Sequence, residues 1–139
     1  MIKKNIRKSR YYAVPVERVW AAITEPELLS KWFMEADFES SVGYEFTFKD
    51  KPQGKWDGVL RGEVLTADAP KLLEYTWKGD QMNHVTTVRW ELESQGDGTQ
   101  VILTHSGFQG FSDTIVGLFH QFGWNKFFNQ LATHLDSTT

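Results

Sequence analysis

Apolar residues recur at helical spacing through the last part of the chain, where residues 112–135 read SDTIVGLFHQFGWNKFFNQLATHL. Apolar positions separated by three and four residues are typical of an amphipathic helix. No proline interrupts the stretch, and either Ser112 or Asp113 can cap its first turn. The pattern therefore predicts one long C-terminal helix over Ser112–Leu135.

The apolar face of this predicted helix changes direction at Gly123-Trp124. At about 100° per residue, Phe119 and Phe122 point nearly opposite to the apolar residues that follow, such as Phe128. One face cannot bury both halves. Either the helix bends near this point, or its first half is covered from a second side by a loop, a ligand or another chain.

The N-terminal residues predict a strand. Polar and apolar residues alternate from Ile2 to Ala13, so that Ile6 and one of Tyr11 or Tyr12 face inward. The basic residues of this segment are better explained as solvated side chains that discourage edge pairing than as a phosphate-binding arm. They are Lys3, Lys4, Arg7, Lys8 and Arg10.

Two short helices are predicted after this strand. Pro15 suits the first turn of a helix that ends near Thr24, and apolar residues follow it at helical spacing. Thr24 and Glu27 have the spacing of a capping box with Pro26 between them, so a second helix is predicted to begin at once. This second helix carries Leu28, Leu29, Trp32 and Phe33.

The middle of the chain reads as strands separated by turns. Apolar and polar residues alternate there, as they do in strands with one buried face. Gly96-Asp97-Gly98 is a hairpin signal, and GFQGF at Gly107–Phe111 predicts a loop before the long helix. The predicted strands are a short one at Phe38, then Tyr44–Phe48, Asp57–Thr66, Leu72–Lys78, Val85–Glu93 and Val101–His105.

One of these strands suggests a concave surface. In Asp57–Thr66, Leu60 and Val64 share one face with two glycines, whose missing side chains leave room for a cavity. If the register of this strand is shifted by one residue, Asp57 and Arg61 point into that space instead.

The order of elements predicts an α+β fold. A strongly curved antiparallel sheet of about six to seven strands would wrap around the long C-terminal helix, with the two short helices between the first and second strands. With 139 residues and 40% hydrophobic content, the chain suits a single domain over residues 1–139.

Composition excludes several kinds of site. The chain has no cysteine, and its four histidines show no metal-binding spacing, so we expect no metal site. Nucleophile elbows, phosphate-binding glycine loops and dinucleotide fingerprints are missing as well, so we expect no cofactor and assign no catalytic residue. A net charge of −3 and a pI near 5.8 argue against nucleic acid as the partner. Without a signal peptide or a membrane-length apolar run, we expect a cytoplasmic protein that does not insert into membranes.

Four stretches resemble, in order, the signatures of SRPBCC proteins, in the branch similar to the C-terminal domain of the activator of the heat-shock protein 90 ATPase. The stretches are VPVERVWAAITEPELLSKWF (Val14–Phe33), GEVLTADAPKLLEYTW (Gly62–Trp77), GTQVILTHSGF (Gly98–Phe108) and GWNKFFNQLATHL (Gly123–Leu135). The resemblance implies a helix-grip fold, like that of the birch pollen allergen and the START lipid-binding domains. It also implies an apolar cavity between the sheet and the long helix.

Such a fold would bring aromatic residues from separate elements around one space. Aromatics make up 14% of the chain, and a pocket lined by them suits a flat apolar ligand. Taken singly, Trp20, Leu29 and Phe33 are each better explained by ordinary helix-to-sheet packing, and His105 by a structural role than by a catalytic one. The residues predicted to line the cavity are Trp32, Phe33, Phe46, Trp56, Leu60, Arg61, Trp77, Trp90, His105, Phe111, Phe119 and Trp124.

Three functions are consistent with the sequence. The first is binding of a hydrophobic small molecule, such as a lipid, a polyketide-like compound or a flat aromatic, as a carrier or sensor. The second is an enzyme acting on such a ligand, which requires an inward polar pair such as Arg61 with His105 or Asp57. The third is a chaperone-regulating module; because no N-terminal domain precedes this region, we expect no chaperone partner. A homodimer is a further alternative for the uncovered half of the long helix.

Overall fold

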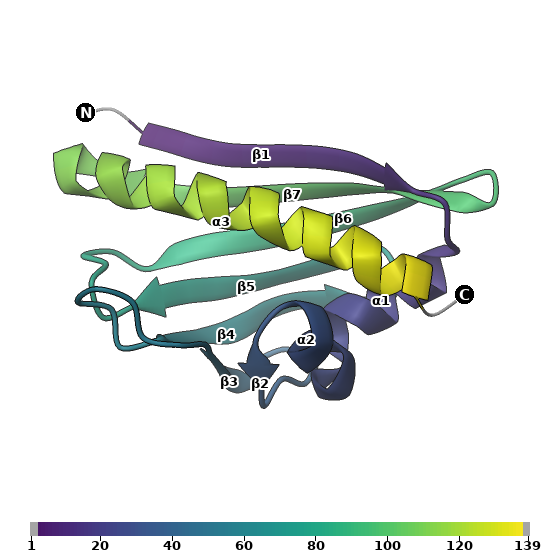
Figure 1. Ribbon diagram of the computed structural model, residues 1–139, viewed down its shortest axis with the longest axis horizontal. Helices are drawn as coiled ribbons and strands as arrows, with labels where there is room; N and C mark the ends of the chain where they lie inside the picture. The colour runs from purple at the N-terminus through teal and green to yellow at the C-terminus, as the bar shows by residue number, and fades with distance from the viewer. Residues whose placement is uncertain (1–2, 138–139) are drawn as a thin grey trace.

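A computed structural model describes residues 3–137, with side chains described for residues 5–109 and 119–137. Figure 1 shows the long C-terminal helix α3 lying along one side of a seven-stranded antiparallel sheet whose order is β1-β7-β6-β5-β4-β3-β2. The elements are β1 (Lys3–Tyr12), α1 (Val16–Thr24), α2 (Pro26–Trp32), β2 (Glu35–Ala36), β3 (Glu45–Lys49), β4 (Val59–Asp68), β5 (Leu72–Gly79), β6 (Thr86–Gln95), β7 (Gly98–Gln109) and α3 (Gly110–Ser137). The predicted α+β helix-grip fold, with two short helices between the first two strands, is confirmed.

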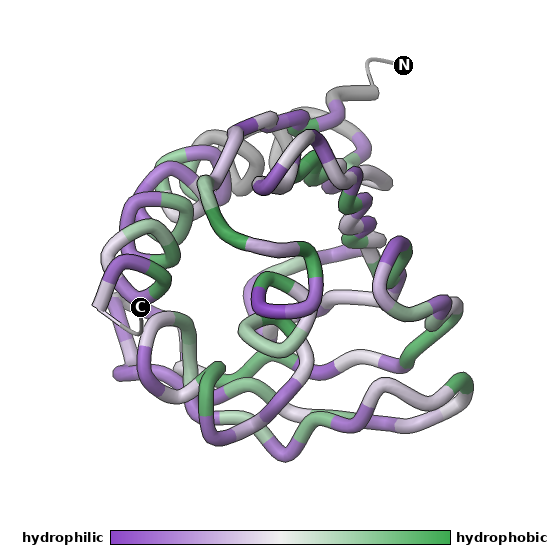
Figure 2. Tube along the Cα trace, turned by 90° about the vertical axis from the view of Figure 1, so that its right-hand side faces the viewer, coloured by the Kyte–Doolittle hydropathy of each residue, from purple (hydrophilic) through white to green (hydrophobic). Residues whose placement is uncertain are grey.

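The central strands bury the faces that their alternation predicts. In β5 the buried residues include Tyr75 and Trp77, and in β6 they include Val88 and Trp90. Tyr75 pairs with Val88 across the two strands, so these side chains lie on one face of the sheet. Figure 2 shows hydrophobic and hydrophilic segments alternating along the trace.

Strand β1 resolves the choice between its two tyrosines. Ile6 and Tyr12 are buried, whereas Tyr11 is half exposed. The Tyr12 hydroxyl donates a hydrogen bond of 3.0 Å to the backbone carbonyl of Phe128 in α3. The inward-facing Tyr12 therefore links the edge strand β1 to the C-terminal helix α3.

The predicted capping box at Thr24 is wrong. Thr24 is the last residue of α1, and its hydroxyl donates to the carbonyl of Trp20 at 2.7 Å. The N-cap of α2 is Glu25, whose backbone is extended and whose side chain makes no capping hydrogen bond. Because α1 continues one residue further than the capping box requires, Thr24 has a helical acceptor and cannot serve the next helix.

Three predicted boundaries also differ from the structure. The GFQGF loop does not form, because Phe108 and Gln109 extend β7 by pairing with β1, and α3 begins at Gly110. Ser112 and Asp113 thus lie inside α3 rather than at its cap, and their side chains are outside the described residues. The short strand predicted at Phe38 lies instead at Glu35–Ala36.

Helix α3 is continuous, and its two halves have different surroundings (Figure 1). In the second half, an apolar stripe is buried against the sheet: Trp124, Phe128, Leu131 and Leu135. Phe119 and Phe122 in the first half are 72% and 73% exposed. The change of face at Gly123-Trp124 therefore divides a packed half from a half whose described phenylalanines are uncovered.

Gly123→Ala should raise the free energy of unfolding by about 0.5–1 kcal/mol, because glycine in a helix loses more backbone entropy than alanine. A Cβ at Gly123 meets no atom within 4 Å, so nothing opposes this gain. Gly96→Ala is the matched control, since its Cβ also meets open space but its φ of +58° strains any L side chain. Urea unfolding should show Gly123→Ala stabilised and Gly96→Ala destabilised; the same sign for both would contradict the prediction.

Candidate functional site

Aromatic rings fill the space between the sheet and the second half of α3. Phe33 stacks on Trp124 at 5.8 Å between ring centroids, and Trp90 stacks on Phe128 at 5.8 Å. Trp32 meets Trp90 edge-on at 6.5 Å. These contacts make the buried stripe on the second half of α3 part of the packed core.

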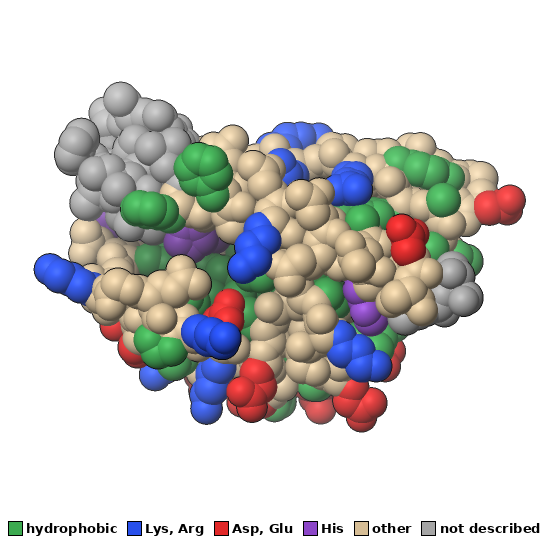
Figure 3. Space-filling model, in the orientation of Figure 1, with side chains coloured by type: hydrophobic (Ala, Val, Ile, Leu, Met, Phe, Trp, Pro, Cys, Tyr) green, Lys and Arg blue, Asp and Glu red, His purple; other side chains and the backbone are tan. Residues whose placement is uncertain are grey.

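A pocket of about 820 Å³ lies at the other end of the helix. Figure 1 shows the loops that follow β3 and β5 at the same end as the first half of α3. In the same orientation, Figure 3 shows a hollow there with hydrophobic and histidine side chains inside it. The apolar side chains lining the pocket are Met34, Trp56, Leu60, Trp77, Met82, Phe119, Phe122, Trp124 and Phe127. Its polar lining comes from Asp50, Gln53, Lys55, Gln81, His120 and Lys126.

The structure brings five of the predicted cavity residues to this pocket: Trp56, Leu60, Trp77, Phe119 and Trp124. Four others are buried in the core instead, with ring contacts among themselves or to neighbouring aromatics: Trp32, Phe33, Phe46 and Trp90. Phe111 cannot be placed, because its side chain is outside the described residues.

The prediction that Arg61 lines the cavity is wrong. Arg61 is exposed, whereas its neighbour Leu60 is buried, because successive side chains of β4 point to opposite faces of the sheet. Asp57 is exposed in the loop before β4. The shifted register that would turn both inward therefore does not occur, and neither residue lies beside buried His105 to make a catalytic pair.

His105 is fully buried, and both ring nitrogens are hydrogen-bonded. The Trp124 indole N–H donates to Nδ1 at 3.0 Å. The Thr86 hydroxyl donates to the Trp77 carbonyl at 2.8 Å, so its oxygen accepts the Nε2 proton of His105 at 2.7 Å. Burial, together with the nearby His120, holds the pKa of His105 well below its ordinary value. His105 is therefore a neutral structural histidine behind the pocket wall.

The indole N–H groups of the pocket wall are all occupied. Trp56 donates to the Val59 carbonyl at 3.1 Å, and Trp77 donates to Nε2 of His120 at 3.0 Å. Trp124 donates to His105, as described above. The tryptophans therefore present ring surface to the pocket and no spare hydrogen-bond donor.

Several pocket residues were missed by the sequence patterns. Met34 and Met82 lie outside the regular strands and helices, where periodicity gives no sign of burial. His120, Lys126 and Phe127 lie on the predicted helix, but their position opposite the loops depends on how α3 crosses the sheet. For Phe127, the aromatic content of the helix was the one sequence signal that indicated a place in the pocket.

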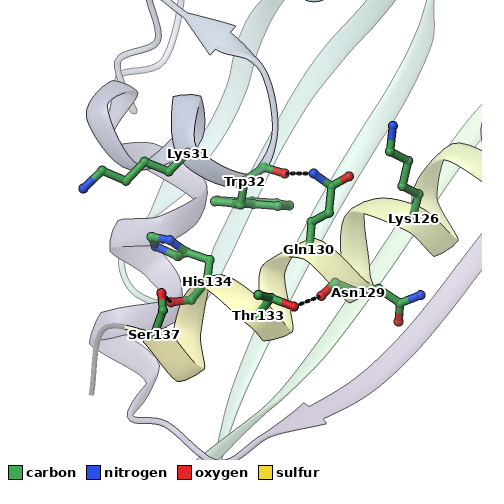
Figure 4. A pocket seen from close by; sticks show the side chains of 8 residues that line it. All are labelled: Lys31, Trp32, Lys126, Asn129, Gln130, Thr133, His134 and Ser137. Carbon is green, nitrogen blue, oxygen red and sulfur yellow. Dashed lines mark hydrogen bonds between the residues drawn. The ribbon is translucent and has the colours of Figure 1, made fainter.

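A second hollow, of about 660 Å³, lies between α2 and the end of α3 (Figure 4). Gln130 donates from its side-chain amide to the Trp32 carbonyl at 3.1 Å, and its own carbonyl oxygen is buried without a partner among the described residues. Burial and the neighbouring Lys31 and Arg18 lower the pKa of His134 on the same wall. Seven of its eight lining residues have polar side chains, which sets this groove apart from the aromatic pocket.

Two further features bear on the kind of site. Within residues 3–137, no helix has the length and apolar content needed to cross a membrane. Among the side chains that the structure describes, those of residues 5–109 and 119–137, no three His, Asp or Glu residues come together as potential metal ligands.

Comparison with known families gives one assignment over most of the chain. The family model described as "Activator of Hsp90 ATPase homolog 1-like protein" matches residues 13–136. No curated protein matches the sequence.

Solved structures share the fold over nearly the whole chain. Protein MLL2253 from Mesorhizobium loti is 30% identical with a TM-score of 0.85, covering 98% of this chain and 99% of that one. CalU16 from Micromonospora echinospora is 23% identical with a TM-score of 0.77, covering 96% and 74%. PFC0360w, an Hsp90 activator from Plasmodium falciparum, is 22% identical with a TM-score of 0.79, covering 95% and 96%. At the identities of the last two, the likeness extends to the fold alone.

Proposed function

This chain belongs to the activator of Hsp90 ATPase homolog 1-like family, and within that fold we propose that it binds a hydrophobic small molecule as a carrier or sensor. The proposed site is the pocket between the Asp50–Trp56 loop, the turn after β5 and the first half of α3. The observation that carries the proposal is the aromatic lining of this pocket, which opens to solvent although the rest of the interior is filled by rings.

The size and chemistry of the pocket support a drug-sized apolar ligand. Its volume of about 820 Å³ lies within the range of about 300–1,000 Å³ that is usual for small-molecule sites. Trp56, Trp77 and Trp124 offer flat ring surfaces, and their indole N–H groups are already bonded. A polycyclic aromatic compound or an acyl chain would therefore replace water on these rings without leaving a protein donor unpaired.

An apolar ligand should quench the tryptophan fluorescence of the protein in a saturable way, because three of the six tryptophans line the pocket. The same ligand should raise the melting temperature, since at 100 times its Kd it stabilises the folded state by about 2.7 kcal/mol. A panel of fatty acids, fatty alcohols and polycyclic aromatics would be titrated by both methods. No saturable quenching and no thermal shift with any of them would refute the proposal.

Gly123→Leu assigns any observed binding to this pocket. Gly123 lines the pocket and a Cβ there meets open space, so a leucine side chain can fill the mouth without displacing the backbone. The Kd for the best ligand should rise about tenfold or more with the fold retained, as judged by circular dichroism. Gln121→Leu is the matched control, because Gln121 is exposed on the same helix and is not part of the pocket lining. Equal affinities for the two variants would place the ligand elsewhere.

A further inference from the structure

Hydrogen-bonding capacity is distributed unevenly between the wall and the mouth of the proposed pocket. On the wall, the three tryptophan donors are engaged, and the Met82 sulfur accepts the Gly79 backbone N–H at 3.2 Å. At the mouth, by contrast, Lys55 and Lys126 are exposed and form no salt bridge within the part of the chain that the structure describes. A ligand in this pocket therefore meets apolar surface along its body and cationic donors at one end.

The charges around the mouth are not balanced. Lys55 comes from the loop after β3 and Lys126 from α3, so the two lysines join the lining from different elements. Asp50 is the acidic residue of the lining, and its carboxylate accepts the Lys51 backbone N–H at 2.8 Å. The lining thus carries two ammonium groups and one carboxylate, one oxygen of which accepts a hydrogen bond within its own loop.

We propose that the ligand is an amphiphile with an apolar body and a single anionic group, a carboxylate or a comparable oxyanion, held at the mouth by Lys55 and Lys126. The inference rests on the proposed function, because the body of the ligand must occupy the aromatic pocket. Lysine suits this role because its apolar stem lies along the hydrophobic rim while the ammonium reaches the charge. Charge-assisted hydrogen bonds to an oxyanion are stronger than neutral ones, so the head group decides which ligands bind best.

Paired ligands that share a body but differ in the head group test this inference. Dodecanoate, dodecanol and dodecyltrimethylammonium form one series, and 1-pyrenebutyrate and 1-pyrenebutanol form another. Titration calorimetry at neutral pH should give a Kd about tenfold lower for each acid than for its alcohol, with the ammonium compound weakest. The preference for the acids should shrink as NaCl rises from about 0.05 M to about 0.5 M.

Three variants locate the charge effect. Lys126→Met and the double variant Lys55→Met/Lys126→Met remove ammonium groups but keep the apolar stems. The preference for the acids should fall in the single variant and disappear in the double variant, while the alcohols bind as before. Lys31→Met is the matched control, because Lys31 is exposed and lines the other groove; its preference should equal that of the unmodified protein.

The outcomes separate the two proposals. If acids and alcohols bind equally to the unmodified protein, or if the double variant keeps the preference for acids, the anionic head group is refuted and the hydrophobic pocket stands. If no compound of either series binds, both the pocket function and the inference fail.

Discussion

Leu131→Ala should lower the free energy of unfolding by about 3–5 kcal/mol, whereas Phe119→Ala should change it by less than about 0.5 kcal/mol. Both residues lie on α3 and both substitutions remove a large apolar side chain. Leu131 is fully buried in the packed half of the helix, while Phe119 is 72% exposed at the pocket mouth.

The difference arises from what surrounds each side chain. Leu131 lies on the stripe of α3 that includes Trp124 and Phe128, whose rings stack on Phe33 and Trp90. Removing three carbon atoms there loses their transfer free energy and leaves a cavity that stacked rings cannot easily fill. Phe119 has little burial to lose, so its truncation should instead weaken ligand binding.

Urea unfolding followed by circular dichroism measures both effects, and Phe122→Ala is a second exposed control at 73% exposure. Native mass spectrometry of the same proteins would show whether the exposed phenylalanines support a dimer. Equal losses of stability for Leu131→Ala and Phe119→Ala would mean that the whole helix is core.

The protein should also become less stable as the pH falls from 6.5 to 5, because the folded state holds His105 neutral. In the unfolded chain this histidine has a pKa of about 6.5 and takes up a proton as the pH falls. In the folded protein, burial and the nearby His120 hold the pKa of His105 well below that value, so the ring stays neutral. Because the unfolded state then binds more protons, acid favours unfolding, by at most about 1.4 kcal/mol per pH unit for this one group.

The hydrogen bonds explain why His105 resists protonation. A second ring proton would have to sit on Nδ1, where the Trp124 indole N–H already donates. The other nitrogen, Nε2, already donates its proton to the Thr86 oxygen, because the Thr86 hydroxyl itself donates to the Trp77 carbonyl. The imidazolium form would therefore set two donors against each other at Nδ1 in a fully buried site.

His105→Gln tests the pH effect separately from the loss of packing. The variant should be less stable than the parent at neutral pH, but its stability should fall less steeply between pH 6.5 and pH 5. Denaturant unfolding across this range gives both slopes, and NMR of the parent should show no titration of the His105 ring over the same range. Identical slopes, or a ring that titrates near pH 6.5, would rule the account out.

Residues whose environment follows from local periodicity were predicted correctly. Alternation placed Tyr75, Trp77 and Trp90 inside, and helical spacing placed Leu131 on the packed side of the long helix. The resemblance to the helix-grip family supplied the arrangement of the sheet around α3. In both cases the prediction succeeded because a period of two or 3.6 residues fixes which side chains share a face.

Residues whose role depends on a neighbouring element were predicted less well. Thr24 has the spacing of a cap, but the extra length of α1 gives its hydroxyl a different acceptor. Residues 108–109 read as a loop, but pairing with the distant β1 makes them strand. A local sequence pattern does not show which acceptor a hydroxyl will bond or which distant strand a segment will pair with.

The sequence by itself determined the order of the main elements, the buried faces of β5 and β6 and the division of the C-terminal helix at Gly123-Trp124. Only the tertiary structure decided which aromatics fill the core and which line a pocket. Phe33 and Trp90 are as apolar as Trp56 and Phe119, but the first two stack on rings of α3 while the other two lie at the open end. The physical reason is that the hydrophobic effect is non-directional: it favours covering any apolar side chain and does not select which ones are covered. The path of α3 across the sheet makes that selection, and the aromatic side chains that α3 leaves uncovered are available to a ligand.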